Sequence, residues 1–302
     1  MQTSALIAVL AVLIPVIGGP FCYLVERISS KARNAYAITL GFVSAGLTLS
    51  LIPSIAEGSV QNFLWIPGVT IRISFCLDSF GVFVAVVAGC IGSRALLYSL
   101  RYMEHAEPEY SLSRYYWQAL FFIGGMIGLV LTSNLLVMYI FWEIIGFCSY
   151  ALIGYYYHDP EPIPAGTKAF IVTRIGDVGF LAGILILWHA TGSLNVFEIM
   201  NAAGSISPAL LGLAGAGFIA GAVGKSAQFP LHVWLPDAMV APTTITSLIH
   251  AACLVNAGIY LLGRSYPIFM GVDGWSTAIV WIGAITALLA ATVALTQWDI
   301  KR

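Results

Sequence analysis

Charged residues are scarce in this sequence. They make up 9% of its 302 residues, whereas hydrophobic residues make up 59%, and the mean hydropathy is +0.90. A soluble domain carries roughly a quarter charged residues, so this composition cannot cover a water-facing surface. The apolar residues also form runs of about 20, which is long enough to cross a bilayer. The composition therefore predicts an integral membrane protein surrounded by lipid.

Sequence motifs for cofactors and metals are missing as well. The five cysteines are scattered, with no Cys-x-x-Cys, so neither an iron–sulfur cluster nor a zinc site of ordinary spacing is expected. No nucleotide-binding glycine motif and no histidine pair suited to haem is found. The formal net charge of −1 gives no argument for nucleic-acid binding. We expect no cofactor, so any redox chemistry would belong to a partner protein.

The hydrophobic runs predict an all-α fold of about nine spanning helices, near residues 4–25, 34–55, 79–100, 115–133, 135–157, 166–190, 208–239, 242–263 and 275–297. The first run has no basic segment before it and no small-residue cleavage site after it, so we expect a spanning helix and not a removed signal. Residues 58–77 alternate β-branched and aromatic residues around Pro-Gly, which predicts a small hairpin. Residues 193–203 predict a short helix in the membrane interface.

Basic residues fall mostly on one side of this predicted topology. The positive-inside rule assigns that side to the cytoplasm, which places the N-terminus outside and the C-terminus inside. The basic residues on the cytoplasmic side are Arg27, Lys31, Arg33, Arg101, Arg114, Lys168, Lys301 and Arg302, and only Arg72 and Arg264 lie on the other side.

The run 208–239 is too long for a straight crossing. It contains Lys225, Pro230 and Pro236 near its middle, and proline removes a backbone donor and disrupts a helix. Irregular backbone at membrane depth is tolerated where it is buried in protein or lines a wet cavity. A broken helix that carries a lysine is typical of an ion pathway.

Glu143 and Lys225 are the two most informative ionisable residues. A charged side chain at the centre of a spanning helix costs roughly 2.5–3.5 kcal/mol, so each needs a partner or a task. We hypothesise that they form an adjustable pair. When they are close the lysine keeps its proton, and when they separate the apolar surroundings favour the neutral amine. The structural alternative is a static ion pair that fixes helix packing.

Arg174 and Asp177 lie three residues apart, on one face of a predicted helix. A local salt bridge would neutralise both, and an electrostatic effect on the neighbouring lysine is the functional alternative. Asp177 could also reach Lys225 and compete there with Glu143.

Histidines suggest a proton relay. His250 lies inside a predicted span near Thr244, Thr246 and Ser247, and histidine titrates near neutral pH through two ring nitrogens. A core histidine bonded to a carbonyl is the structural alternative. His232 and Asp237, near the cytoplasmic end of the broken span, are possible parts of a proton entrance.

Several segments resemble the antiporter-like subunits of respiratory complex I, above all the large L-type subunit, and related subunits of F420H2 dehydrogenases, membrane-bound hydrogenases and Mrp antiporters. These segments are WEIIGFCSYALIGYYY, KAFIVTRIGDVGF, GKSAQFPLHVWLPDAM, APTTITSLIHAA and TQWDIKR. The resemblance runs from about residue 78 to the end. AMVAPTTI departs from the Gly-Pro-Thr-Pro form that is usual in L-type chains.

The resemblance implies inverted five-helix repeats, each with a broken helix. It implies that Glu143, Lys225 and His250 carry the proton input half-channel, and that Arg174 and Asp177 match the family's sixth-helix pair. Lys301 matches a basic residue at the connection between half-channels. The implied organisation is helices 1–3 in 1–114, with the hairpin on the extracytoplasmic side, a proton-channel repeat in 115–264, and the first helix of a second repeat in 265–302.

Family members continue beyond the D-I-K-R segment into a second repeat. We therefore expect this chain to be the N-terminal part of a longer subunit, or one half of a split subunit whose second half-channel is supplied by another segment or chain. Its partners would be other membrane-arm subunits of an NADH-, F420H2- or ferredoxin:quinone-type oxidoreductase in an energy-transducing prokaryotic or equivalent membrane. Such a chain would translocate protons and catalyse no redox step itself.

Two alternative functions share the same residues. An Mrp-type subunit would exchange Na⁺ for protons, and a membrane energy-coupling subunit would serve inorganic-carbon uptake. Sodium-dependent transport and the proteins that copurify with the chain would discriminate among them.

Overall fold

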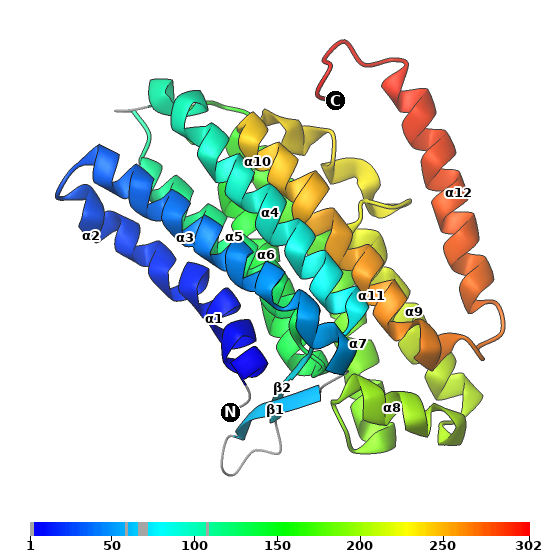
Figure 1. The fold of residues 1–302 in the computed structure, drawn as a ribbon. Coiled ribbons are helices and arrows are strands. Elements are labelled where there is room, and N and C mark those ends of the chain that lie inside the picture. Colours follow the sequence, from blue (N-terminus) through cyan, green and yellow to red (C-terminus); the bar gives the residue numbers. More distant parts are fainter. Residues whose placement is uncertain (1–2, 58–59, 66–71, 107–108) are drawn as a thin grey trace.

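The protein is a bundle of long helices lying side by side (Figure 1). The computed structural model describes residues 3–57, 60–65, 72–106 and 109–302. The longer helices are α1 (Thr3–Gly18), α3 (Ser30–Ser50), α4 (Ser79–Tyr102), α5 (Leu112–Leu131), α6 (Leu135–Ile153), α7 (Pro162–Thr191), α9 (Pro208–Lys225), α11 (Leu254–Phe269) and α12 (Trp275–Ala294). The short helices are α2 (Cys22–Glu26), α8 (Val196–Ala202) and α10 (Thr243–Ser247).

The expected membrane-spanning helical fold is confirmed. In the described residues, eight helical segments are long and apolar enough to cross a membrane, and the first of them joins α1 and α2 over Thr3–Glu26. The remaining long helix, α5, begins with a polar turn that carries Arg114 and Gln118, and nearly all of its length is buried among the other helices. With α5, the helices match the nine segments expected from the hydrophobic runs.

The two ends of the bundle differ. Strands β1 (Val60–Trp65) and β2 (Arg72–Cys76) pair antiparallel at one end, with Val60 opposite Cys76. Residues 58–59 and 66–71 of the expected hairpin lie outside the described residues. The end that carries β1, β2 and α8 is called here the hairpin end, and the end where α10 begins and the chain terminates is called the α10 end (Figure 1). Short helix α8 lies where an interfacial helix was expected.

Helices α7 and α9 pack closely because glycines line their contact. A Cβ added at Gly217 would lie 2.3 Å from the carbonyl oxygen of Gly179, and one added at Gly176 would lie 2.4 Å from that of Ala220. Small residues let helix backbones approach one another in membranes, where dispersion and polar contacts drive association. The glycines of the α9 sequence therefore serve helix packing.

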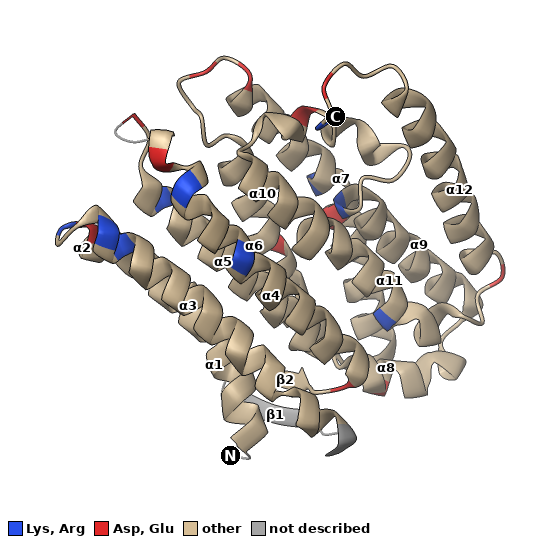
Figure 2. Cartoon of the chain, turned by 45° about the horizontal axis from the view of Figure 1, so that its top comes forward, with Lys and Arg blue, Asp and Glu red and all other residues tan. Residues whose placement is uncertain are grey.

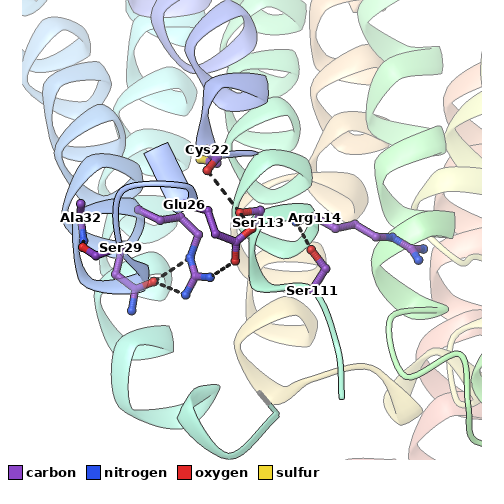
Figure 3. A network of polar contacts seen from close by, with 9 residues as sticks. Cys22, Glu26, Ser29, Ala32, Ser111, Ser113 and Arg114 are labelled. Carbon is purple, nitrogen blue, oxygen red and sulfur yellow. Dashed lines mark hydrogen bonds and ion pairs between the residues drawn. The ribbon is translucent and has the colours of Figure 1, made fainter. Parts of the chain in front are cut away.

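A buried polar cluster joins the N-terminal helices to α5 (Figure 3). Arg33 is fully buried and donates hydrogen bonds to Glu26 and Asn34. Ser113 on α5 donates a 2.6 Å hydrogen bond to the second Glu26 carboxylate oxygen. This cluster neutralises Arg33 within the protein and holds α2 and α3 against α5.

Helix α9 ends at Lys225, in the middle of the expected 208–239 span. Ala227 has a left-handed φ of 50°, the Gln228 amide donates to the Val223 carbonyl at 2.9 Å, and the Ser226 amide donates to the Ala222 carbonyl at 2.8 Å. A left-handed residue with such a six-to-one bond is a Schellman-type helix end. Beyond it the chain forms short 3₁₀ turns at Leu231–Trp234 and Asp237–Val240, so the break separates one half-helix from irregular turns.

A second irregular helix was not expected from the sequence. The span expected at 242–263 is present, and it consists of α10, a π-helical turn at Leu248–Ala252, and α11. In that turn the Cys253 amide donates to the Leu248 carbonyl at 3.0 Å, five residues back. The sequence did not reveal this turn, because hydrophobicity identifies a span but carries no signal for one inserted residue in the hydrogen-bond ladder.

Ala227→Gly should stabilise the protein. A left-handed conformation costs an L-residue other than glycine about 1–2 kcal/mol, and glycine removes that cost at the end of α9. We expect a higher midpoint of thermal unfolding for the purified protein in detergent.

The matched control is Ala216→Gly, at an exposed position inside α9, where glycine costs about 0.5–1 kcal/mol. Opposite shifts of the two variants are expected. A lower midpoint for Ala227→Gly would contradict this account of the helix end.

Candidate functional site

The candidate site centres on Lys225, which is fully buried at the C-terminal residue of α9. The partial negative charge at a helix C-terminus favours a cation there. The ammonium lies against α6, where a Cβ added at Gly146 would be 2.4 Å from Nζ. It also lies 5.6 Å from the ring centroid of Trp142. The end of α9 and the glycine on α6 together make room for one buried cation.

Asp177 on α7 is the carboxylate that faces Lys225. Its Oδ2 lies 3.3 Å from Lys225 Nζ, and both side chains are fully buried. The indole Nε1 of Trp142 donates a 2.5 Å hydrogen bond to the other oxygen, Oδ1. A buried carboxylate needs such partners, because an uncompensated charge in an apolar interior is very costly.

Glu143 pairs with Arg174 and not with Lys225. The Arg174 guanidinium donates to Glu143, and among the ion pairs of the described residues Lys225 is paired with Asp177 alone. The Glu143–Lys225 contact hypothesised from the sequence is therefore not formed in this structure. The two acidic side chains thus have different partners: Arg174 pairs with Glu143, and Lys225 pairs with Asp177.

Arg174 connects the two pairs. Its Nε lies 3.9 Å from Asp177 Oδ2, so the i, i+3 salt bridge expected from the sequence is present as a long contact beside the closer Glu143 pair. The order of charges is Glu143, Arg174, Asp177, Lys225, with alternating signs. The four charges sum to zero when all are ionised, which reduces the cost of burying them.

These four residues, called the charge chain below, run from partly exposed side chains to fully buried ones. Glu143 and Arg174 keep 22% and 34% of their side-chain surface exposed, whereas Asp177 and Lys225 keep none. Glu143 and Arg174 line an open crevice of about 440 Å³ between α5, α6 and α7, together with Phe121, Tyr139, Ile140, Ile144, Phe147 and Phe170. A change at the crevice can therefore reach the buried lysine through adjacent charges.

His250 lies in the π-helical turn between α10 and α11. Its Nε2 is buried and has no hydrogen-bond partner among the described residues. The turn displaces the backbone at this residue, and π-turns of this kind are frequent at functional sites.

A row of hydroxyl groups lies toward the α10 end. Tyr115 on α5 is 2.6 Å from Ser99 on α4 and 2.6 Å from Thr244 on α10, oxygen to oxygen. Tyr102 and Thr243 form a similar contact at 3.0 Å. Hydroxyls both donate and accept hydrogen bonds, so these side chains provide a polar lining between three helices.

The remaining predicted site residues lie near the α10 end. Asp237 forms an ion pair with Lys168 at 2.6 Å, with both side chains nearly half-exposed. His232 lies in the 3₁₀ turn that follows the break. Lys301 donates a 2.9 Å hydrogen bond to the carbonyl of Ala241. These residues surround the region where the broken helix meets the α10 end.

The hairpin end is closed by a different cluster. Arg264 on α11 donates to both carboxylate oxygens of Asp78 and to the Tyr260 hydroxyl, and Tyr260 donates to the Val130 carbonyl at 2.6 Å. Burial disfavours the ionised Asp78 carboxylate, but the hydrogen bonds and charge of Arg264 outweigh this effect and hold the pKa of Asp78 below its usual range. This clamp ties α4, α5 and α11 together.

Several residues of the site were missed in the sequence. Trp142 and Gly146 flank Glu143 on α6, but an indole and a glycine in an apolar run carry no charge signal. Ser99 and Tyr115 lie far from Thr244 in the chain. In the part of the chain that the structure describes, no cluster of histidine, cysteine and acidic residues is suited to a metal ion.

The fold and the buried charge chain define an antiporter-like membrane subunit. The chain belongs to the NADH:quinone oxidoreductase/Mrp antiporter family, whose transmembrane model matches residues 132–302. A second model, for the N-terminus of chain 5 of NADH-ubiquinone oxidoreductase (complex I), matches residues 64–116. The family resemblance seen in the sequence is thereby confirmed.

Individual relatives agree with this assignment. The chloroplastic NAD(P)H-quinone oxidoreductase subunit 5 of Piper cenocladum is 40% identical over 92% of this chain, and chain 5 of the same enzyme from a Picosynechococcus species is 37% identical over all of it. The chain spans only 39% and 47% of the lengths of these two relatives.

Solved structures share the fold. The Mrp complex from a Dietzia species contains a chain that matches 99% of this one with a TM-score of 0.87 and 29% identity, and 32% of that chain is covered. An archaeal membrane-bound sulfane sulfur reductase contains a chain that matches 97% with a TM-score of 0.86 at 24% identity, and 60% of that chain is covered. The second likeness shows the fold alone.

A double-mutant cycle tests the Lys225–Asp177 pair. Asp177→Asn and Lys225→Met should each destabilise the protein by about 3–5 kcal/mol, because each leaves one buried charge uncompensated. The double variant should recover much of that loss, since it carries neither charge. Thermal unfolding of the purified protein measures the coupling.

The matched control uses the nearly half-exposed pair. Asp237→Asn and Lys168→Met should change stability by about 0–1 kcal/mol, as is typical for exposed pairs. An Asp177→Asn variant as stable as Asp237→Asn would exclude a buried ion pair at Lys225.

Proposed function

We propose that this chain forms a proton half-channel in a multi-subunit, energy-transducing membrane complex, where a redox reaction of partner subunits drives proton translocation. The observation that carries this proposal is the fully buried Lys225 at the end of a broken helix, 3.3 Å from an equally buried Asp177. Ionisable groups inside membrane segments are costly and typically mark proton or ion pathways.

The proton switch works through the charge neighbours of Lys225. When Arg174 pairs with Glu143, Asp177 can hold the protonated lysine. In this arrangement Asp177 Oδ2 lies 3.9 Å from Arg174 Nε and 3.3 Å from Lys225 Nζ. If Arg174 moves toward Asp177, the lysine shares its counter-charge and the apolar surroundings favour the neutral amine. A movement of one guanidinium thus loads or unloads a proton at Nζ.

The polar residues of the α10 end provide the entry route in this proposal. Protons would pass the Ser99, Tyr115 and Thr244 hydroxyls and His250 on their way to Lys225. His250 suits such a relay because either ring nitrogen can take or give a proton, and its buried Nε2 lacks a hydrogen-bond partner in the described structure. Lys301 would connect this half-channel to a second one in another segment or chain.

The orientation follows from the distribution of charge. Lys and Arg positions are more frequent toward the α10 end than toward the hairpin end (Figure 2), and Arg264 lies near the C-terminal end of α11, toward the hairpin end. By the positive-inside rule the α10 end faces the cytoplasm, which puts the N-terminus outside and the C-terminus inside. Protons would then enter from the cytoplasmic side.

Substitutions at the charge chain should uncouple proton translocation from the redox reaction. Lys225→Ala is expected to abolish translocation in a complex that still assembles. Glu143→Gln should have a similar effect, and Glu143→Asp should keep part of the activity because it keeps the carboxylate. Acidification of vesicles that contain the complex, followed with a pH-sensitive dye beside substrate oxidation, measures both activities.

The Asp177→Asn/Lys225→Met double variant separates function from stability. It removes the uncompensated charge and should therefore assemble normally, yet it should translocate no protons through this site. Near wild-type translocation by this variant would refute the proposal.

A second candidate function is a subunit of a Na⁺/H⁺ antiporter. The 29% identity and TM-score of 0.87 to a chain of the Mrp complex favour it. We expect the first function, in which dye-reported proton translocation requires the redox substrate and does not depend on Na⁺. Na⁺-driven proton movement without any redox substrate, lost in Lys225→Ala, would assign the chain to the second function instead.

A further inference from the structure

Five aromatic rings lie in a row between the Lys225–Asp177 pair and the hairpin end. Adjacent ring centroids are 5.1 Å apart for Trp142 and Phe180, 5.0 Å for Phe180 and Phe218, 5.0 Å for Phe218 and Phe269, and 5.4 Å for Phe269 and Trp275. These rings are contributed in turn by α6, α7, α9, α11 and α12. They are called the aromatic column below.

Most of the column is closely packed, and its last ring, Trp275, lines a cavity of about 660 Å³ together with residues of α9, α11 and α12. Four of its rings are fully buried, and Trp275 is 4% exposed. Glycines on the neighbouring helices make room for it, since a Cβ added at Gly183 would lie 2.9 Å from Phe218, and one added at Gly215 would lie 2.9 Å from Trp275. Aromatic pairs at these separations attract each other beyond their area burial, so the rings support one another across five helices.

No member of the column can pass a proton along. Phenylalanine has no polar atom, and an indole N–H is a donor only. Both indoles are already engaged, Trp142 with Asp177 at 2.5 Å and Trp275 with the Gly215 carbonyl at 3.2 Å. Hydrophobic constrictions block conduction by excluding water, and a proton needs either water or a titratable chain to advance.

The two sides of the buried pair therefore differ in chemistry. Toward the α10 end lie the hydroxyls of Ser99, Tyr115 and Thr244, while toward the hairpin end lies the aromatic column. Arg264, which lies toward that end, is held by Asp78 and Tyr260, and it offers no onward step because an arginine does not release its proton in proteins.

We propose that the aromatic column is the barrier that closes the Lys225–Asp177 site to the hairpin end, with Phe218 at its centre. This inference rests on the proposed function and adds a reason for one-sided access. Protons at Lys225 can return only to the side from which they came, or move on laterally, because the rings of the column pack against one another and offer no chain of proton donors and acceptors toward the hairpin end.

The test measures passive proton flux through the intact complex. Vesicles that contain the complex receive a potassium-diffusion potential, without redox substrate, and a pH-sensitive dye reports proton entry. Phe218→Ala should raise the flux several-fold, because it leaves a void between the rings of Phe180 and Phe269. Phe218→Leu keeps apolar volume there and should stay near the wild-type flux.

Two further variants make the result specific. Phe122→Ala removes a fully buried ring on α5 outside the column, and it should not leak. Adding Lys225→Met to Phe218→Ala should return the flux to the wild-type level, because the leak is expected to pass through the site. A leak that persists in this double variant would show a path that bypasses Lys225, and it would overturn the proposal.

A second column position guards against failure to assemble. Phe269→Ala removes the next ring and should leak in the same way, with assembly checked by recovery of the intact complex. If neither alanine variant leaks more than Phe122→Ala, the column is not the barrier. That result would leave the proposed function standing, since redox-driven translocation and its loss in Lys225→Ala are measured separately.

Discussion

The need to neutralise charge inside an apolar medium governs this structure. Lys225 and Asp177 are both fully buried, and neither could remain ionised there alone. Their pairing requires α7 and α9 to approach closely, and the glycines between these helices permit that approach. It also requires α9 to end at the lysine, where the helix terminus favours a cation. The position of the break follows from this electrostatic requirement.

In the proposed switch, Arg174 makes the buried pair adjustable. It is paired with Glu143 but remains 3.9 Å from the Asp177 carboxylate, so it lies between two acidic groups. The guanidinium could pair with Glu143 or with Asp177, and nearby charges would favour one arrangement over the other. Two such arrangements are the physical basis of coupling between sites. Since Glu143 and Arg174 line an open crevice, a change of charge at the crevice would alter the electrostatic surroundings of the buried Lys225–Asp177 pair.

The fold also gives the site a direction. Toward the α10 end the hydroxyl groups come from α4, α5 and α10, whereas toward the hairpin end the aromatic rings come from α6, α7, α9, α11 and α12. A proton site with equal access from both sides would dissipate a gradient, because it would conduct whenever it was occupied. In the proposed function, the different chemistry of these two sets of side chains prevents such conduction without any moving segment.

The sequence by itself determined the membrane class, the number and approximate limits of the helices, the break near Lys225 and the presence of ionisable residues within the spans. These follow from hydrophobic run length and from the cost of charge in lipid, which are properties of single segments. Only the tertiary structure decided the partners. Asp177 and not Glu143 faces Lys225, a π-helical turn carries His250, and five rings distant in sequence form one column, because these features depend on helix rotation and contact geometry that periodicity does not encode.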